Sequence, residues 1–112
     1  MQFGLTVDDS HPPYAVLTAS GEIDVATAPD LRAALLDLIG EGRTRIVVDL
    51  EQVEFLDSTG LGVLVSTVKR VRADGGDLSV VCTRPQILQV FEITGLTAVF
   101  SVHDSLDQAV AS

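Results

Sequence analysis

The chain has 112 residues, of which 46% are hydrophobic and only 4% aromatic, and it carries a formal net charge of −9. This length suits a single domain over residues 1–112, with a core built mainly from Val, Leu, Ile and Ala. The negative charge argues against nucleic-acid binding, because neutralising phosphates requires clustered Lys and Arg. No stretch approaches 18 apolar residues and no signal peptide is evident, so we expect a cytoplasmic protein that does not bind membranes.

The first third of the chain predicts two strands followed by a helix. The strands are expected over 3–7 and 14–19, and Gly21-Glu22-Ile23-Asp24 closes the second one. A helix is expected next, with Thr27 suited to capping its first turn and a glycine at position 40 or 42 ending it.

The remainder alternates strands and helices. Residues 51–56 are expected to form a loop, and Lys69, Arg70 and Arg72 a solvated basic strip on a helix. Thr83 and Asp104 are expected to cap the last two helices. The segments predicted are 46–50 (strand), 57–73 (helix), 78–82 (strand), 83–95 (helix), 99–102 (strand) and 104–110 (helix). This order favours an α/β fold with a mixed sheet of about five strands flanked by about four helices.

Ser58 stands where the chain passes from a buried strand and loop into a helix, within Asp57-Ser58-Thr59-Gly60-Leu61-Gly62. Taken alone, a serine in this place is most simply an N-cap. Gly60 and Gly62 each cost about 0.5–1 kcal/mol relative to alanine inside a helix. Two such residues in one turn indicate either tight packing of the helix on the sheet or close approach by a partner, and both interpretations stay open.

Acidic residues surround this motif. Glu22, Asp24, Glu54 and Asp57 all lie at strand ends or helix starts that could converge on one edge. A phosphoryl group on Ser58 would add about −1.5 to −2 charges at pH 7, which a helix amino terminus tolerates. Two or three carboxylates on a docked surface would repel that charge, so a phosphorylation switch is physically feasible.

Enzyme chemistry finds little support in the motifs. A hydrolase nucleophile typically lies in G-x-S-x-G, but position 56 is Leu, and His11 and His103 both resemble solvated turn residues. In a dinucleotide fingerprint the third glycine would fall at Val65, and no phosphate-binding G-x-x-x-x-G-K-[ST] sequence occurs. We therefore expect no enzymatic activity and no nucleotide cofactor.

A metal site is not expected either. The acidic pairs Asp8-Asp9 and Asp74/Asp77 lie in turns without His or Cys at ligand spacing. Cys82 is the single cysteine, and its neighbours Val80 and Val81 predict a buried, unreactive thiol.

Four segments together resemble the anti-sigma factor antagonists, which are stand-alone STAS domains of bacteria. They are Gly21-Glu22-Ile23-Asp24, Ile46-Val47-Val48-Asp49-Leu50, the motif from Phe55 to Gly62, and Phe91-Glu92-Ile93-Thr94-Gly95-Leu96. The resemblance covers nearly the whole chain in the expected order and implies a STAS-type fold.

The resemblance also implies a function. In this family the serine matching Ser58 is phosphorylated by an anti-sigma factor that is itself an ATP-dependent serine kinase of the histidine-kinase-like type. The unphosphorylated antagonist binds that anti-sigma factor and frees a sigma factor, for example in a stress response. A PP2C-type, metal-dependent phosphatase reverses the modification. The resemblance therefore implies Ser58 as phosphoacceptor, with a partner-binding surface comprising Glu22, Asp24, Asp57, Ser58, Thr59, Gly60 and Gly62.

A second hypothesis keeps the fold and changes the role. The chain could be a constitutive STAS scaffold subunit of a stress-signalling or lipid-transport assembly, in which Ser58 serves merely as an N-cap.

Overall fold

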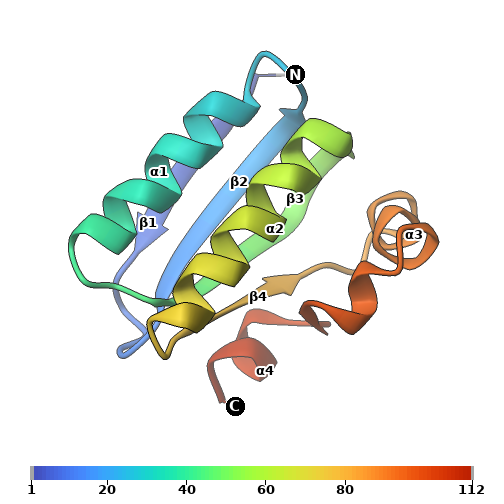
Figure 1. The fold of residues 1–112 in the computed structure, drawn as a ribbon. Coiled ribbons are helices and arrows are strands. Elements are labelled where there is room, and N and C mark those ends of the chain that lie inside the picture. Colours follow the sequence, from blue (N-terminus) through green and yellow to red (C-terminus); the bar gives the residue numbers. More distant parts are fainter. Residues whose placement is uncertain (1, 112) are drawn as a thin grey trace.

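Five strands form one mixed sheet in the order β1-β2-β3-β4-β5 (Figure 1). The computed structural model describes residues 2–111. Strand β1 pairs antiparallel with β2, whereas β2, β3, β4 and β5 run parallel to one another. The strands are β1 (Gly4–Asp8), β2 (Ala15–Ile23), β3 (Arg45–Leu56), β4 (Asp77–Val81) and β5 (Ser101–His103). The predicted mixed sheet is confirmed.

Each parallel connection passes through a helix, as parallel pairing requires. The helices are α1 (Ala28–Gly40), α2 (Ser58–Ala73), α3 (Pro85–Ile93) and α4 (Leu106–Ala111), with a 3-10 turn η1 (Leu96–Ala98) before β5. Helices α1 and α2 lie side by side on one face of the sheet, with α3 beyond α2 (Figure 1). The short α4 packs on the opposite face.

The core is almost entirely aliphatic, as the composition predicted. Alternate residues of the strands, such as Ile46, Val48 and Leu50 of β3, are buried under α1, α2 and α3. The opposite face carries a small separate cluster of Val16, Val47, Val81 and Ala109 under α4. The sheet therefore buries most of its apolar surface on one side, and helices α1 and α2 are fixed there.

The loop predicted over residues 51–56 is wrong, because β3 continues to Leu56. Val53 and Leu56 are buried, while Glu54 and Phe55 are exposed. These residues pair with the last residues of β2, where Ile23 lies opposite Leu56. The extension carries the chain to the edge of the sheet before α2 begins.

Gly21 allows the end of β2 to continue alongside this part of β3. Its φ of +86° is a conformation that L side chains rarely adopt, and a Cβ there would lie 2.5 Å from the carbonyl oxygen of Gln2. The register between β2 and β3 shifts at this point, between Gly21 and Glu22. This irregularity sets the direction of Glu22 and Ile23, the last residues of β2, and of Asp24 after them.

Several predicted caps differ from those observed. Arg84 precedes α3 in the N-cap position, and Thr83 instead donates its hydroxyl hydrogen to the Glu51 carboxylate at 2.9 Å. Ser105 takes the role expected of Asp104, because its Oγ accepts a hydrogen bond from the Gln108 N–H at 3.2 Å. The final strand begins at Ser101, two residues later than predicted.

The basic strip on α2 is only partly solvated. Arg72 Nε donates to Asp77 Oδ1 at 2.8 Å, and its Nη2 donates to the Val99 carbonyl at 2.6 Å. Arg72 thus ties the end of α2 to β4 and to the segment before β5. Lys69 and Arg70 are exposed, as expected.

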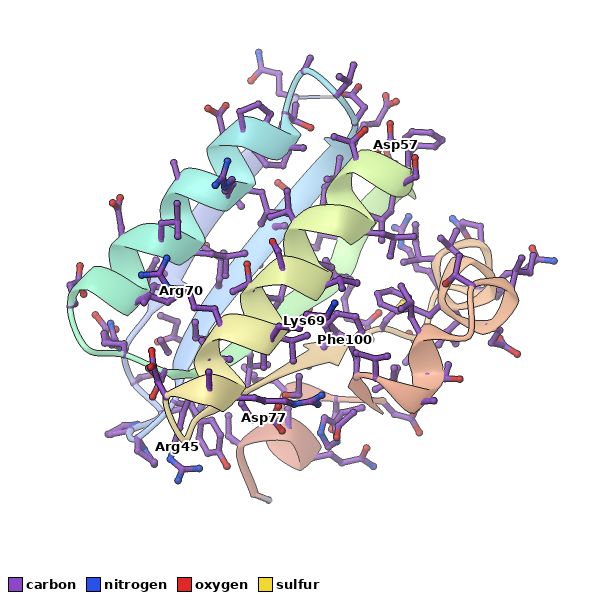
Figure 2. All side chains as sticks on the ribbon, in the orientation of Figure 1. Arg45, Asp57, Lys69, Arg70, Asp77 and Phe100 are labelled. Atoms are coloured by element: carbon purple, nitrogen blue, oxygen red, sulfur yellow. The ribbon has the colours of Figure 1, made fainter. Side chains whose placement is uncertain are left out.

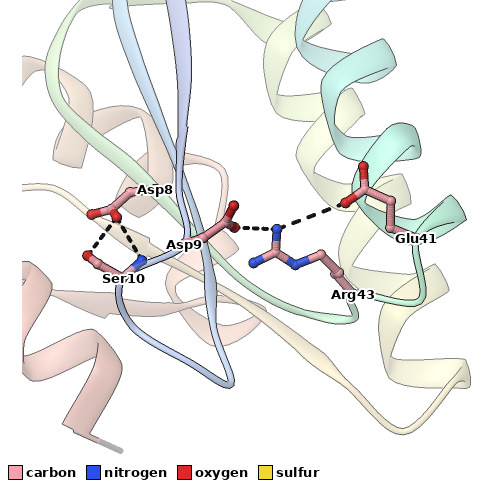
Figure 3. A network of polar contacts seen from close by, with 5 residues as sticks. All are labelled: Asp8, Asp9, Ser10, Glu41 and Arg43. Carbon is pink, nitrogen blue, oxygen red and sulfur yellow. Dashed lines mark hydrogen bonds and ion pairs between the residues drawn. The ribbon is translucent and has the colours of Figure 1, made fainter.

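A polar network closes the edge of the sheet at which β2 and β3 begin (Figure 3). Arg43, in the loop after α1, pairs with Asp9 in the turn after β1 and approaches Glu41 at 4.0 Å. The Asp8 Oδ1 accepts hydrogen bonds from the Ser10 N–H and hydroxyl, and these lower the pKa of Asp8. The Ser58 motif lies at the opposite edge of the sheet, where β2 and β3 end.

Across residues 2–111, no helix combines the length and apolar character needed to cross a lipid bilayer.

We expect Cys82 to be unreactive in the native protein. Its side chain is fully buried, and this desolvation raises the pKa of the thiol. Because the thiolate is the reactive species, a thiol reagent such as DTNB should react slowly with folded protein and rapidly in concentrated urea. Rapid, complete labelling of the folded chain would contradict this placement.

Candidate functional site

The Ser58 motif lies at the edge of the sheet where β2 and β3 end and where α1 and α2 begin (Figure 1). The backbone N–H of Asp57 donates to the carbonyl oxygen of Ile23 at 3.1 Å. This bond joins the last residue of β2 to the residue that precedes α2. Asp24 and Ser58, which follow these two residues, are thereby brought to the same edge.

Asp57 is the N-cap of α2 (Figure 2). Its backbone is extended, and its Oδ1 accepts hydrogen bonds from the N–H groups of Thr59 at 2.9 Å and Gly60 at 3.2 Å. Its carbonyl oxygen accepts the Leu61 N–H at 3.1 Å, which is the first helical hydrogen bond. The interpretation of Ser58 as the N-cap is therefore wrong.

Ser58 is the first residue of α2, and it is exposed. Among residues 2–111 its hydroxyl has no hydrogen-bond partner, and Asp57 already accepts the N–H groups of Thr59 and Gly60 that a capping serine would bind. Thr59, also exposed, places a second hydroxyl beside it. The site thus presents an available serine oxygen that the fold does not use.

The loop between β2 and α1 is held by Asp24 and Thr27. Asp24 Oδ1 accepts hydrogen bonds from the N–H groups of Ala26 at 2.9 Å and Thr27 at 3.1 Å. The Thr27 hydroxyl donates to the Glu22 carbonyl at 2.8 Å and accepts the Asp24 N–H at 2.9 Å. Thr27 occupies the N-cap position of α1 without a side-chain cap bond, so its side chain fixes the loop instead of the helix.

The two glycines of the motif differ in their surroundings. Gly60 is buried, and a Cβ there would lie 2.5 Å from Ile23 Cγ2 and 2.7 Å from Leu56 Cδ1. Gly62 is exposed, and a Cβ there would meet nothing within 4 Å. Tight packing on the sheet accounts for Gly60, while Gly62 leaves open space on the surface.

Two exposed apolar side chains flank this edge, and neither was among the predicted site residues. Val25, in the loop before α1, is 73% exposed, and Phe55, opposite Glu22 in the sheet, is 47% exposed. An apolar residue within a polar loop, as at Val25, was the available signal. These side chains add apolar area to a surface otherwise marked by carboxylates.

The histidines lie away from Ser58. His11 is in the turn between β1 and β2, where its Nε2 lies 3.5 Å from Asp8 Oδ2. His103 is the last residue of β5, so its predicted place in a turn is wrong. Within residues 2–111 no three His, Cys, Asp or Glu side chains form a group that could hold a metal ion. The chemistry present at this edge is that of an exposed hydroxyl among carboxylates.

The STAS domain family model matches residues 6–109, so the chain belongs to the STAS domain family. Two curated relatives from Staphylococcus are named as anti-sigma-B factor antagonists. The anti-sigma-B factor antagonist of Staphylococcus aureus is 37% identical over 87 residues, which are 78% of this chain and 81% of that protein. The resemblance found in the sequence is confirmed.

Solved structures of other proteins have the same fold. An anti-sigma factor antagonist from Mycobacterium paratuberculosis superposes with a TM-score of 0.90 at 34% identity, covering 98% of this chain and 92% of that one. The phosphorylated form of the Bacillus cell fate determinant SpoIIAA superposes with a TM-score of 0.75, covering 96% and 97% of the two chains. Its 22% identity shows a shared fold alone.

Alanine at the two glycines should have opposite effects on the free energy of unfolding. Gly60→Ala places a methyl group against Ile23 and Leu56 and should lower it by about 1–3 kcal/mol. Gly62→Ala meets open space and should raise it by about 0.5–1 kcal/mol through helix propensity. Urea unfolding of both variants measures this, and a shift of both in the same direction would refute the packing described.

Proposed function

We propose that this chain is an anti-sigma factor antagonist that acts as one STAS unit over residues 1–112 and is not itself an enzyme. In its unphosphorylated form it binds and sequesters an anti-sigma factor that is an ATP-dependent serine kinase, and a sigma factor is released. Phosphorylation of Ser58 ends this binding. A PP2C-type phosphatase hydrolyses the phosphoserine and restores the binding form. ATP and metal ions belong to these partners.

The observation that carries the proposal is the state of the Ser58 hydroxyl. It is exposed at the start of α2 and has no hydrogen-bond partner among residues 2–111, while Asp57 provides the cap. A kinase can approach this oxygen without breaking a contact that stabilises the fold. The scaffold hypothesis loses its main argument, because it assigned Ser58 the capping role that Asp57 holds.

The proposed modification is a simple phosphoryl transfer. Ser58 Oγ attacks the γ-phosphorus of ATP bound to the kinase, and an O–P bond forms as the bond from that phosphorus to the β,γ-bridging oxygen breaks. ADP leaves, and the hydroxyl proton passes to a base of the kinase. This chain supplies only the acceptor oxygen and its position.

The proposed binding surface surrounds that oxygen. It comprises Glu22, Asp24, Asp57, Ser58, Thr59 and Gly62, with Gly60 lying beneath them and setting the distance between α2 and the sheet. Gly62 leaves room for a partner's backbone or side chain to approach the first turn of α2. Glu22 and Thr59 are exposed, whereas Asp24 and Asp57 are half-buried and also hold the two loops.

The added charge is large enough to act as a switch. A carboxylate of the partner about 7 Å from a unit negative charge, at an effective dielectric constant near 20, is repelled by about 2.4 kcal/mol. Each 1.4 kcal/mol corresponds to about a tenfold change in affinity, so two or three partly screened terms weaken binding by about a hundredfold or more.

The relatives support the same role. The Staphylococcus aureus and Mycobacterium paratuberculosis proteins are both described as antagonists of anti-sigma factors. The Bacillus protein has been solved in phosphorylated and unphosphorylated forms, so this fold can carry a phosphoryl group.

Incubation with the cognate anti-sigma factor kinase and Mg-ATP should place one phosphoryl group on Ser58, as located by peptide mass spectrometry. Ser58→Ala should remain unmodified, because it lacks the acceptor oxygen. Thr59→Ala removes the neighbouring exposed hydroxyl, and its phosphoryl group should still be located on Ser58, although Thr59 belongs to the binding surface and its loss can slow the reaction. Equal labelling of Ser58→Ala and the wild type would refute the assignment.

Ser58→Asp should lower the affinity for the anti-sigma factor while leaving the stability of the fold nearly unchanged. The fixed negative charge should weaken binding to the anti-sigma factor tenfold or more in isothermal titration calorimetry. The free energy of unfolding should change by less than about 0.5 kcal/mol, because Ser58 is exposed and its hydroxyl forms no hydrogen bond among residues 2–111.

Ser101→Asp adds the same charge on the exposed edge strand β5 and should bind like the wild type. If both variants lose affinity equally, the effect is one of net charge and the proposed site is wrong. A stable assembly indifferent to both Ser58→Asp and phosphatase treatment would favour the scaffold role.

A further inference from the structure

A groove of about 600 Å³ runs between α1 and α2 and opens beside the Ser58 motif. Thr59 lies at its mouth, and apolar side chains line most of it. A smaller hollow of about 120 Å³, which shares Arg32 and Leu36 with the groove, continues it along the two helices to Arg70. The groove therefore extends from the proposed phosphoacceptor towards the carboxyl ends of both helices.

The lining has the character of a binding surface for apolar side chains. Val25 and Leu36 are 73% and 37% exposed, although both are large apolar residues. Ala28 and Ala33 of α1 and Val63 of α2 also line the groove. The alanine side chains are small and leave space between the two helices. Contiguous exposed apolar area of this kind, rimmed by polar residues, marks an interaction surface.

Charge changes sign along the groove. The end beside Ser58 carries Asp57 and the acidic loop before α1, whereas Arg32 lines the groove further along α1 and, with Arg70, the hollow that continues it. In the described part of the chain, residues 2–111, neither Arg32 nor Arg70 forms an ion pair. Figure 2 shows Arg70 reaching from α2 towards α1. The chain as a whole has a net charge of −9, but these two unpaired guanidinium groups make the hollow locally basic. Guanidinium groups bind carboxylates through paired hydrogen bonds.

We propose that this groove binds an amphipathic helix of the anti-sigma factor. Its apolar side chains lie between Ala33 and Val63, and an acidic side chain over the adjoining hollow pairs with Arg32 and Arg70. Two packed helices with a groove between them offer no free strand edge, so a helix is the secondary structure that fits. This inference rests on the proposed function and adds to it the surface that selects the partner.

The position of the groove links partner selection to phosphorylation. Thr59 belongs to both surfaces, so a helix docked in the groove ends next to the Ser58 hydroxyl. The groove would hold the kinase through contacts that persist while its active site is at Ser58. A phosphoryl group would then face the docked segment directly.

Paired substitutions test the groove. Leu36→Ser and Arg70→Glu should each weaken binding of the purified anti-sigma factor that phosphorylates the wild type by tenfold or more, and raise its KM for phosphorylation. Val7→Ser and Arg45→Glu are the controls. Val7 is a 47% exposed apolar residue on edge strand β1, and Arg45 lines a separate hollow on the face of the sheet that α4 covers. Both controls should bind within twofold of the wild type.

A photo-crosslinking residue gives a measurement that does not depend on loss of affinity. Placed at position 36, it should crosslink to a helical segment of the anti-sigma factor that contains Asp or Glu, and placed at position 7 it should not. Reversing that acidic residue to Arg in the partner should restore binding to Arg70→Glu.

The outcomes separate the two proposals. If the wild type neither binds an anti-sigma factor nor is phosphorylated by one, the proposed function fails and this inference fails with it. If the wild type binds and is phosphorylated, while Leu36→Ser and Arg70→Glu match the controls, only the groove is refuted. A wild-type dimer in light scattering that Leu36→Ser converts to a monomer would show that a second copy covers the groove, and it would overturn the inference.

Discussion

The hydrogen bond from the Asp57 N–H to the Ile23 carbonyl is the constraint on which the site depends. It joins two strand ends that are far apart in the sequence, and the side chain of the same aspartate caps α2. Because Asp57 supplies both contacts, the Ser58 hydroxyl is left without a hydrogen-bond partner among residues 2–111. An accessible serine at a helix start is thus a consequence of the residue that precedes it.

Packing beneath the motif fixes the height of this serine above the sheet. Gly60 allows the first turn of α2 to approach Ile23 and Leu56 more closely than any side chain would permit. These two residues are themselves paired across β2 and β3, beyond the irregularity at Gly21. The exposed first turn therefore rests on a rigid base, and a partner meets a surface that needs little ordering when it binds.

Much of this arrangement could be predicted from the sequence, because aliphatic strands and the three-to-four spacing of α2 reflect burial directly. The segment 51–56 was missed because Glu51, Gln52 and Glu54 are typical of a loop, while their pairing with β2 is a long-range contact. The cap was assigned to Ser58 for a related reason, since Asp57 and Ser58 have similar preferences and only the backbone geometry distinguishes them. Arg32 and Leu36 of α1 lie far in sequence from Arg70 of α2, so the surface they share emerges only from the packing of α1 against α2.

The division of roles between Asp57 and Ser58 also bears on the proposed switch, in which a charge controls binding without unfolding the protein. A phosphoryl group at a helix start ordinarily gains hydrogen bonds from free N–H groups and stabilises the fold. Here the N–H groups of Thr59 and Gly60 are already bonded to Asp57 Oδ1, so that gain is small. The nearby Asp57 carboxylate opposes what gain remains. In the proposed switch the added charge therefore acts mainly on a partner that covers Ser58, so that affinity changes while the fold stays stable.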